Sequence, residues 1–242
     1  MKAKYQRRIV AFVDMLGISD RLLSSESKAF ARTIHTVISA LTGKKPTVFF
    51  VLPHVRTNEE VEIQFDKPLG GGDRMTTLSD AVVMSFPAEE QNNQFAPGSK
   101  SLPILRALEA VFWLQRGLLT LGVRTRGGIC RGELFHTGAF VFGEAMVRAY
   151  RLESRTAVYP RAVVDEELIE VLLSEAIPDI ALFSNRVAHA VRIDRDGQYF
   201  VDYLGYDPLQ GDFGMKRRIV DIYRETAEDL KSSPDSRLAA KL

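Results

Sequence analysis

The chain has 242 residues, of which 45% are hydrophobic and 26% charged, and its 32 basic and 31 acidic side chains give a formal net charge of +1. This composition is typical of a globular protein and excludes wholesale disorder. The balanced charge argues against a general nucleic-acid binder, whose surface is normally strongly basic. Cys130, a lone cysteine, excludes an intramolecular disulfide. The apolar runs are far shorter than the roughly 18 residues that span a bilayer, so we expect a soluble, cytoplasmic protein.

Hydrophobic spacing predicts strands and helices that alternate along the chain. Residues 9–13 are continuously apolar and indicate a buried strand, which ends at Asp14 and turns near Gly17. The further predicted strands are 47–52, 61–65, 75–78, 81–86, 123–131, 133–135, 160–164, 188–193 and 199–204. The predicted helices are 22–41, 101–121, 142–157, 165–173 and 215–230. We expect Gly132 to be the turn of a hairpin.

This order of elements predicts an α+β fold. We expect a mostly antiparallel sheet with helices packed on one face, in the manner of ferredoxin-like folds, and a C-terminal strand and helix extension. No segment has the composition of a linker, so the whole chain, 1–242, is interpreted as a single domain.

Two acidic residues stand at the ends of apolar strands. Asp14 follows a buried strand, where an unpaired carboxylate is costly, although a helix cap would explain it equally well. Asp80 lies between two apolar strands, and a turn aspartate is its ordinary explanation. Residues 15–19 turn toward a helix, whose free N–H groups bind anions. As a pair beside such a turn, the two carboxylates would suit Mg²⁺ or Mn²⁺.

Other polar residues admit several interpretations. Arg148, Arg151 and Arg155 are spaced to share one helical face, which a solvated surface explains as well as an anion site. The role of Arg126 stays open: it could bind phosphate, pair with a partner carboxylate or simply keep the surface soluble. Cys130 is interpreted as a small core side chain. We expect only structural or surface roles for the histidines, which are His35, His54, His136 and His189.

These residues fall into three ordered blocks that resemble the class III nucleotide cyclases. Residues 11–19 (AFVDMLGIS) are similar to the F-x-D-I-x-G-F block of that family, and residues 77–86 (TLSDAVVMSF) to its I-G-D block. The third block is similar to R-x-G-I-x-x-G followed by G-x-x-V-N-x-A-x-R-x-x-E, over residues 126–133 (RGGICRGE) and 142–153 (FGEAMVRAYRLE). The resemblance implies a cyclase core over about residues 8–165, with 166–242 as the extension.

The resemblance implies a role for each matched residue. Asp14 and Asp80, with Met15 beside the first, fall at the ligands of two Mg²⁺ or Mn²⁺ ions, and Arg151 falls at the arginine that stabilises the transition state. The substrate would be a nucleoside triphosphate. The family builds each site from two subunits, which implies a head-to-tail homodimer with shared active sites, without a nucleic acid or membrane partner. The residues expected to bind phosphate are Leu16, Gly17, Ile18 and Ser19.

Three departures from the family pattern bear on the substrate. The asparagine that orients the ribose falls on Val147, and the purine-reading lysine and its partner acid fall on Thr76 and near Phe140. Phe50 is a further base-pocket candidate. The bacterial anti-phage pyrimidine cyclases of the Pycsar type have a similar Asp-x-Leu-Gly turn and Ser-Asp pair, which favours UTP as substrate. The alternatives are a purine (adenylate) cyclase and a non-catalytic, cyclase-like module that binds nucleotide or dimerises.

Overall fold

The structure is a computed structural model of the whole chain. It describes residues 5–18, 22–23, 27–42, 48–53, 60–65, 72–89, 98–137, 140–174 and 191–204, and the side chains of all of these except 40–42, 48–53 and 60–65. The predicted helix over 215–230 lies outside the described residues, as do Ser19, His54 and His189.

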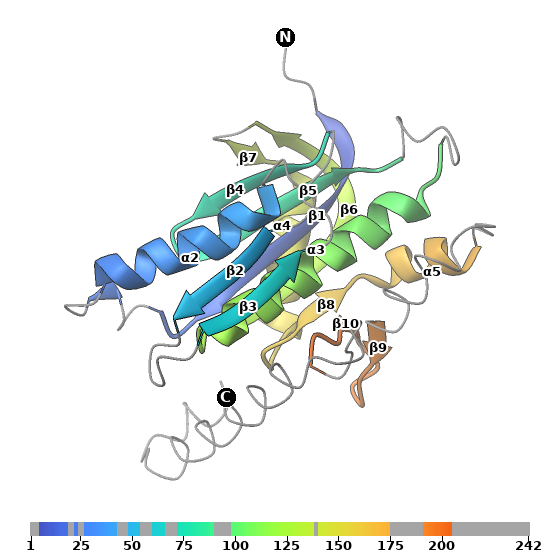
Figure 1. Cartoon of the computed structure of the whole chain (residues 1–242). Helices are drawn as coiled ribbons and strands as arrows, with labels where there is room; N and C mark the ends of the chain where they lie inside the picture. Colours follow the sequence, from blue (N-terminus) through green and yellow to red (C-terminus); the bar gives the residue numbers. More distant parts are fainter. Residues whose placement is uncertain are drawn as a thin grey trace.

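An eight-stranded sheet forms the centre of the molecule, in the order β4-β5-β1-β6-β8-β10-β9, with β7 paired to β6 (Figure 1). Among the described strands, all pairings in this sheet are antiparallel except that of β6 with β8, so the predicted α+β class with a mostly antiparallel sheet is confirmed. The strands are β1 (Gln6–Leu16), β4 (Arg74–Leu78), β5 (Ala81–Pro87), β6 (Arg124–His136), β7 (Val141–Phe142), β8 (Ala162–Val164), β9 (Val191–Ile193) and β10 (Tyr199–Val201). A separate hairpin joins β2 (Val48–Pro53) to β3 (Glu60–Phe65).

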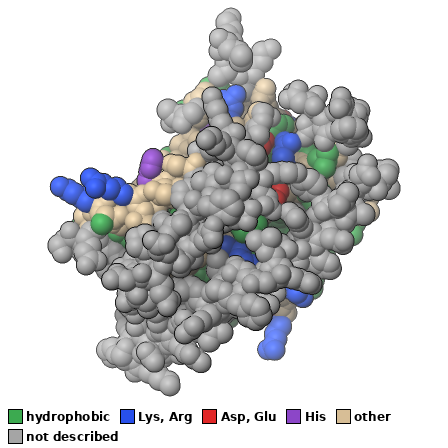
Figure 2. Space-filling model, in the orientation of Figure 1, with side chains coloured by type: hydrophobic (Ala, Val, Ile, Leu, Met, Phe, Trp, Pro, Cys, Tyr) green, Lys and Arg blue, Asp and Glu red, His purple; other side chains and the backbone are tan. Residues whose placement is uncertain are grey.

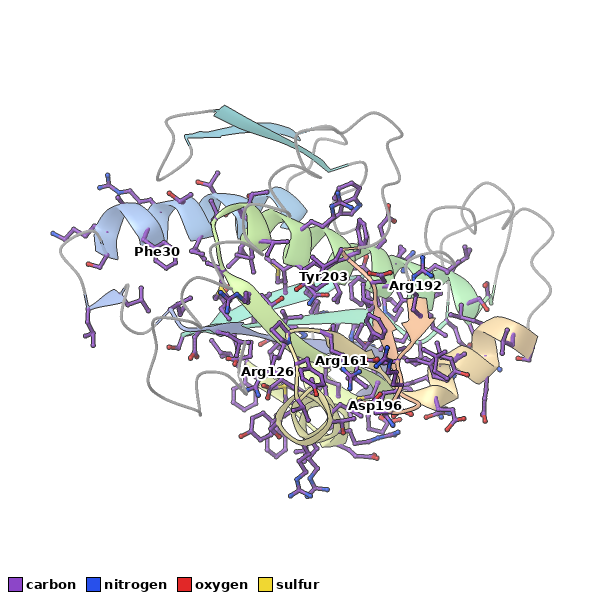
Figure 3. The ribbon with its side chains drawn as sticks, turned by 90° about the horizontal axis from the view of Figure 1, so that it is seen from below. Phe30, Arg126, Arg161, Arg192, Asp196 and Tyr203 are labelled. Atoms are coloured by element: carbon purple, nitrogen blue, oxygen red, sulfur yellow. The ribbon has the colours of Figure 1, made fainter. Side chains whose placement is uncertain are left out.

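Helices cover both faces of this sheet. The described helices are α2 (Ser27–Thr42), α3 (Ser101–Thr120), α4 (Glu144–Arg151), which continues into a π-helical turn (Leu152–Thr156), and α5 (Glu166–Ser174). Alternate residues of β1 point to opposite faces: Ile9 and Val13 pack with α2, α3 and α5, while Val10 and Phe12 pack with α4. Figure 3 shows α4 on the opposite side of the sheet from α2 and α3. The expectation of helices on one face is therefore wrong in this respect, because a strand that is apolar on both faces needs cover on both.

The long strand β6 runs without a break from Arg124 to His136, so the hairpin predicted at Gly132 is wrong. Its glycines allow α4 to approach instead. A Cβ at Gly132 would lie 3.2 Å from the Cβ of Ala145, and one at Gly128 would lie 2.2 Å from the carbonyl oxygen of Ala149. Glycine inside a strand often marks such close approach of another backbone. The glycines thus place α4 and its π-helical turn directly on β6.

The second half of the chain completes the same core. Leu168 of α5 and Val201 of β10 are fully buried in the cluster that contains α3. Arg161, buried just before β8, pairs with Asp194 and Asp196 in the β9–β10 turn (Figure 3). Residues 166–204, where described, therefore share the hydrophobic core and the sheet of the preceding segment.

The outer face of α2 is polar. Its exposed residues include Lys28, Arg32 and His35, and Figure 2 shows basic side chains at this end of the molecule. The helix begins at Ser27, later than the spacing predicted. None of the described helices combines the length and apolar character that crossing a membrane requires.

A buried hydrogen-bond network fixes the end of β6 over β5 and β4. The Nδ1 atom of His136 is 2.7 Å from Oγ of Ser85, and its Nε2 atom is 2.9 Å from Oγ1 of Thr76. Arg8 donates from Nε to the Ser85 hydroxyl at 2.8 Å. Burial, and then the positive charges of Arg8 and Arg74, lower the pKa of His136 to about 4. The ring is therefore neutral at pH 7, and the structural role expected of this histidine is confirmed.

This network predicts acid-sensitive stability. In the unfolded chain the pKa of His136 is near 6.5, so between that pH and about 4 the unfolded state binds the additional proton. The free energy of unfolding should consequently fall as the pH drops through this window, by up to about 1.4 kcal/mol per pH unit. Denaturant unfolding at a series of pH values measures the slope. His136→Asn should reduce it, whereas His35→Asn on exposed α2 should not; equal slopes in all three proteins would contradict the prediction.

Candidate functional site

The two acidic residues singled out in the sequence meet at one end of the sheet. Asp14 near the end of β1 pairs in register with Ala81 of β5, and the backbone N–H of Met15 donates to the carbonyl of Asp80 at 2.8 Å. Asp80 lies in the β4–β5 turn beside Ser79, whose φ of +50° is uncommon for a non-glycine residue. The side chain of Met15 is buried in the core, so Met15 offers this site only backbone atoms.

The carboxylates at this position repel one another. The side chain of Asp14 is 22% exposed, and its pKa is raised first by burial and then by the charge of Asp80, while Arg126 acts in the opposite direction. A cation beside the pair would relieve the repulsion, and carboxylate oxygens are the donors that Mg²⁺ and Mn²⁺ prefer. Within the described ranges, no three His, Cys, Asp or Glu side chains form a metal-binding group. The pair fits a divalent ion that takes its remaining ligands from a substrate or solvent.

Arg126 lies between two carboxylates of its own chain. It stands opposite Asp14 in the β1–β6 register, and its Nη2 atom is 3.8 Å from Oδ2 of Asp14 and 2.7 Å from Oε1 of Glu153. Burial raises the pKa of Glu153, and the charge of Arg126 opposes that rise. The sequence left the partner of Arg126 open and singled out Glu153 only as the end of a motif. The opposite charges of Arg126 and Glu153 were the only sign in the sequence that the two residues could pair. Whether they meet depends on how α4 and the turn after it pack on β6.

The turn after β1 contains the residues predicted to bind phosphate. Leu16 ends the strand, and Gly17 is exposed with a φ of +68°. The side chain of Ile18 is buried, and its carbonyl accepts the N–H of Leu22 at 2.9 Å. Ser19 lies outside the described residues. The phosphate-binding role of these residues stays a prediction.

The three arginines predicted to share one basic face have different surroundings. Arg148 donates to Asp165 at 2.7 Å and to the carbonyl of Arg131 at 2.9 Å, so its charge is used within the chain. Arg151 is exposed and makes no ion pair with the residues that the structure describes, and Arg155 is also exposed. Of the three, Arg148 is therefore a structural residue. Val147, at the predicted ribose position, is exposed four residues before Arg151.

Two of the three base-pocket candidates, Thr76 and Phe140, lie near the end of β6. Thr76 is buried with its hydroxyl bonded to His136, which sequence analysis did not connect with it. Phe140 is exposed, and its ring packs on Phe135 at a centroid distance of 5.9 Å. Phe50 lies in β2, but its side chain is outside the described residues. The structure therefore brings Thr76 next to His136 and Phe140 next to Phe135, both at the C-terminal end of β6.

Several solved structures are similar to this chain. The monomeric guanylyl cyclase domain of a fusion protein from the aquatic fungus Blastocladiella emersonii matches with a TM-score of 0.45 and 13% identity, over 83% of this chain and 98% of that one. A bacterial light-regulated adenylyl cyclase matches with 0.42 and 14%, over 90% of this chain and 59% of its own. A class III adenylyl cyclase-like ATP-binding protein from Pseudomonas aeruginosa matches with 0.44 and 9%, over 91% of this chain and 41% of its own.

This chain thus spans about three-fifths and two-fifths of the lengths of the latter two structures. No protein-family model matches it, and no curated protein sequence does.

The different surroundings of Arg148 and Arg151 predict different effects on stability. Arg148→Gln removes charged hydrogen bonds between α4, β6 and Asp165, and should lower the free energy of unfolding by about 1 kcal/mol after allowance for solvent screening. Arg151→Gln, at an exposed position, should change it by less than about 0.5 kcal/mol. Urea unfolding of both variants beside the wild type measures the difference. Equal destabilisation would contradict the assignment.

Proposed function

We propose that this protein is a nucleotide cyclase that converts a nucleoside triphosphate to its 3′,5′-cyclic monophosphate and pyrophosphate. The observation that carries the proposal is the placement of Asp14, near the end of β1, next to Asp80 in the β4–β5 turn, with a 2.8 Å hydrogen bond from the Met15 N–H to the Asp80 carbonyl. Two partly accessible carboxylates in contact with solvent are a suitable site for divalent ions that hold a polyphosphate. The order of the three sequence blocks supports the same reaction class.

Each residue would have a distinct task in this reaction. Asp14 and Asp80 would hold Mg²⁺ or Mn²⁺, which supplies Lewis-acid stabilisation of phosphate charge and of the attacking oxygen. The 3′-oxygen of the ribose forms a bond to the α-phosphorus, the bond to pyrophosphate breaks, and the 3′-proton is released. Arg151 would donate to the α-phosphate oxygens as charge develops on them. The turn over residues 16–19 would offer backbone N–H groups to the leaving phosphates.

A head-to-tail homodimer would complete two such sites. Arg151 makes no ion pair with the described part of its own chain, which suits a role toward a ligand held by another subunit. Beside it on α4, Val147 and Tyr150 are exposed apolar residues, and Phe140 and Phe142 are exposed on the arm that precedes this helix. Exposed apolar residues gathered in this way are typical of an interaction surface. We therefore place the subunit interface on the α4 side of the sheet.

The preferred substrate in this proposal is UTP, and the product a cyclic UMP second messenger in anti-phage defence. The support is the absence of the purine-reading lysine and acid at Thr76 and Phe140.

Product analysis tests the reaction and the base together. Wild-type protein incubated with Mn²⁺ and an equimolar mixture of ATP, GTP, CTP and UTP should yield cyclic UMP as the main product by mass spectrometry. Asp14→Asn and Asp80→Asn should lower turnover by at least about a hundredfold while circular dichroism stays unchanged, because each removes a charged ligand. No cyclic product from any triphosphate would contradict the enzymatic proposal. A large preference for ATP would contradict only the pyrimidine assignment.

Mixing inactive variants tests the shared site. An Asp14→Asn chain combined with an Arg151→Ala chain should recover about a quarter of the wild-type activity, since random pairing makes half the dimers mixed and each of these has one intact site. Two Asp14→Asn chains labelled with different tags serve as the control and should stay inactive. Co-purification of the two tags shows that mixed dimers formed, so absence of recovery in their presence would contradict the shared-site proposal.

A further inference from the structure

Arg126 is shared unequally between two carboxylates. The same atom, Nη2, is 2.7 Å from Glu153 and 3.8 Å from Asp14. The first distance is a close ion pair, whereas the second is too long for a hydrogen bond. The guanidinium is therefore committed to Glu153, although Asp14 stands directly opposite Arg126 in the strand register and has the more accessible carboxylate, 22% exposed against 3%.

Glu153 is fixed in place by the packing of the π-helical turn on β6. A Cβ at Gly128 would lie 2.5 Å from Cβ of Leu152 and 3.0 Å from the backbone N of Glu153, so the turn lies against the strand at this point. The buried carboxylate of Glu153 could move toward Asp14 together with Arg126 only if the π-helical turn lost this packing against β6. The same nitrogen makes both contacts, so its distance to Asp14 and its distance to Glu153 are linked, and the ion pair with Glu153 opposes a closer approach to Asp14.

An arginine in contact with Asp14 would compete with a cation for the same oxygens. Arg126 carries a permanent positive charge and would form a strong charge-assisted hydrogen bond if it reached the carboxylate. The Nε atom of Arg126 is buried and finds no hydrogen-bond partner within the described residues. Arg126 therefore has a donor that could bond to Asp14, and a second carboxylate is needed to keep the guanidinium away from Asp14.

We propose that Glu153 is a positioning residue that holds Arg126 away from Asp14 and so keeps that carboxylate open to a divalent cation. The part of this inference that concerns the cation rests on the proposed function. The part that concerns the arginine does not, because it describes a competition between two carboxylates within the free protein. Arg126 in turn offsets part of the repulsion between Asp14 and Asp80 from its position 3.8 Å away.

A thermodynamic cycle without metal tests the competition. In the wild type with EDTA, Asp14→Asn should leave the melting temperature unchanged or raise it, because the described residues offer the carboxylate only the long 3.8 Å contact with Arg126, and the charge of Asp80 opposes its ionisation. In a Glu153→Gln background Arg126 is free to pair with Asp14, so the same change should lower the melting temperature by about 2–4 °C. An equal effect of Asp14→Asn in both backgrounds would overturn the proposal. Glu153→Asp, a milder change with a shorter reach, should give a smaller shift of the same sign and serves if Glu153→Gln does not fold.

Binding of Mn²⁺ alone, followed by electron paramagnetic resonance on the full chain, tests the consequence for the cation. Glu153→Gln should weaken Asp14-dependent Mn²⁺ binding about tenfold, and Arg126→Gln/Glu153→Gln should bind at least as tightly as the wild type. Glu167→Gln is the matched control. It also removes a carboxylate that pairs with an arginine, Arg131 at 2.6 Å, but this pair does not involve Asp14 or Arg126. Unchanged affinity in Glu153→Gln would overturn the proposal. Wild-type binding that does not depend on Asp14 would instead contradict the proposed function, while the metal-free cycle still decides where Arg126 is held.

Discussion

The burial of β1 on both faces is the constraint on which the rest of the structure depends. β1 pairs with β5 on one side and β6 on the other, and its alternate residues enter two separate apolar clusters. A shift of one residue in either pairing would exchange the two sets of side chains, so the register is strongly specified. That register places Asp14 opposite Arg126 and beside the turn that carries Asp80. Hydrophobic packing therefore fixes the position of the charges.

In the candidate site, the repulsion between two carboxylates is partly offset by an arginine that does not bond to either of them. Asp14 and Asp80 destabilise each other, and Arg126 reduces that cost without occupying the carboxylate. Glu153 is itself buried and depends on Arg126 for its partner. Raised pKa values such as those of Asp14 and Glu153 are common at functional sites. In a separate part of the structure, His136 at the end of β6 bonds to Thr76 of β4 and Ser85 of β5.

Local pattern predicted much of this arrangement and failed where distant elements meet. The strands and helices that the structure describes lie close to their expected ranges, because apolar spacing reflects burial directly. Gly132 was interpreted as a turn because the sequence does not show that Ala145 packs against it. Helical spacing alone grouped Arg148 with Arg151. The spacing could not show that Arg148 pairs with Asp165, which is 17 positions further along the chain. The partner of Arg126 was left open for the same reason.

The sequence by itself determined the class of fold and singled out the two acidic residues, because strand pattern and costly charges at strand ends are local properties. The tertiary structure alone decided which charges face each other. Glu153 meets Arg126 only because the π-helical turn lies on β6 at Gly128, and His136 reaches Thr76 only because the end of β6 crosses β5 and β4. Such contacts join residues 27 and 60 positions apart, and their energies depend on burial and distance, which no local pattern contains.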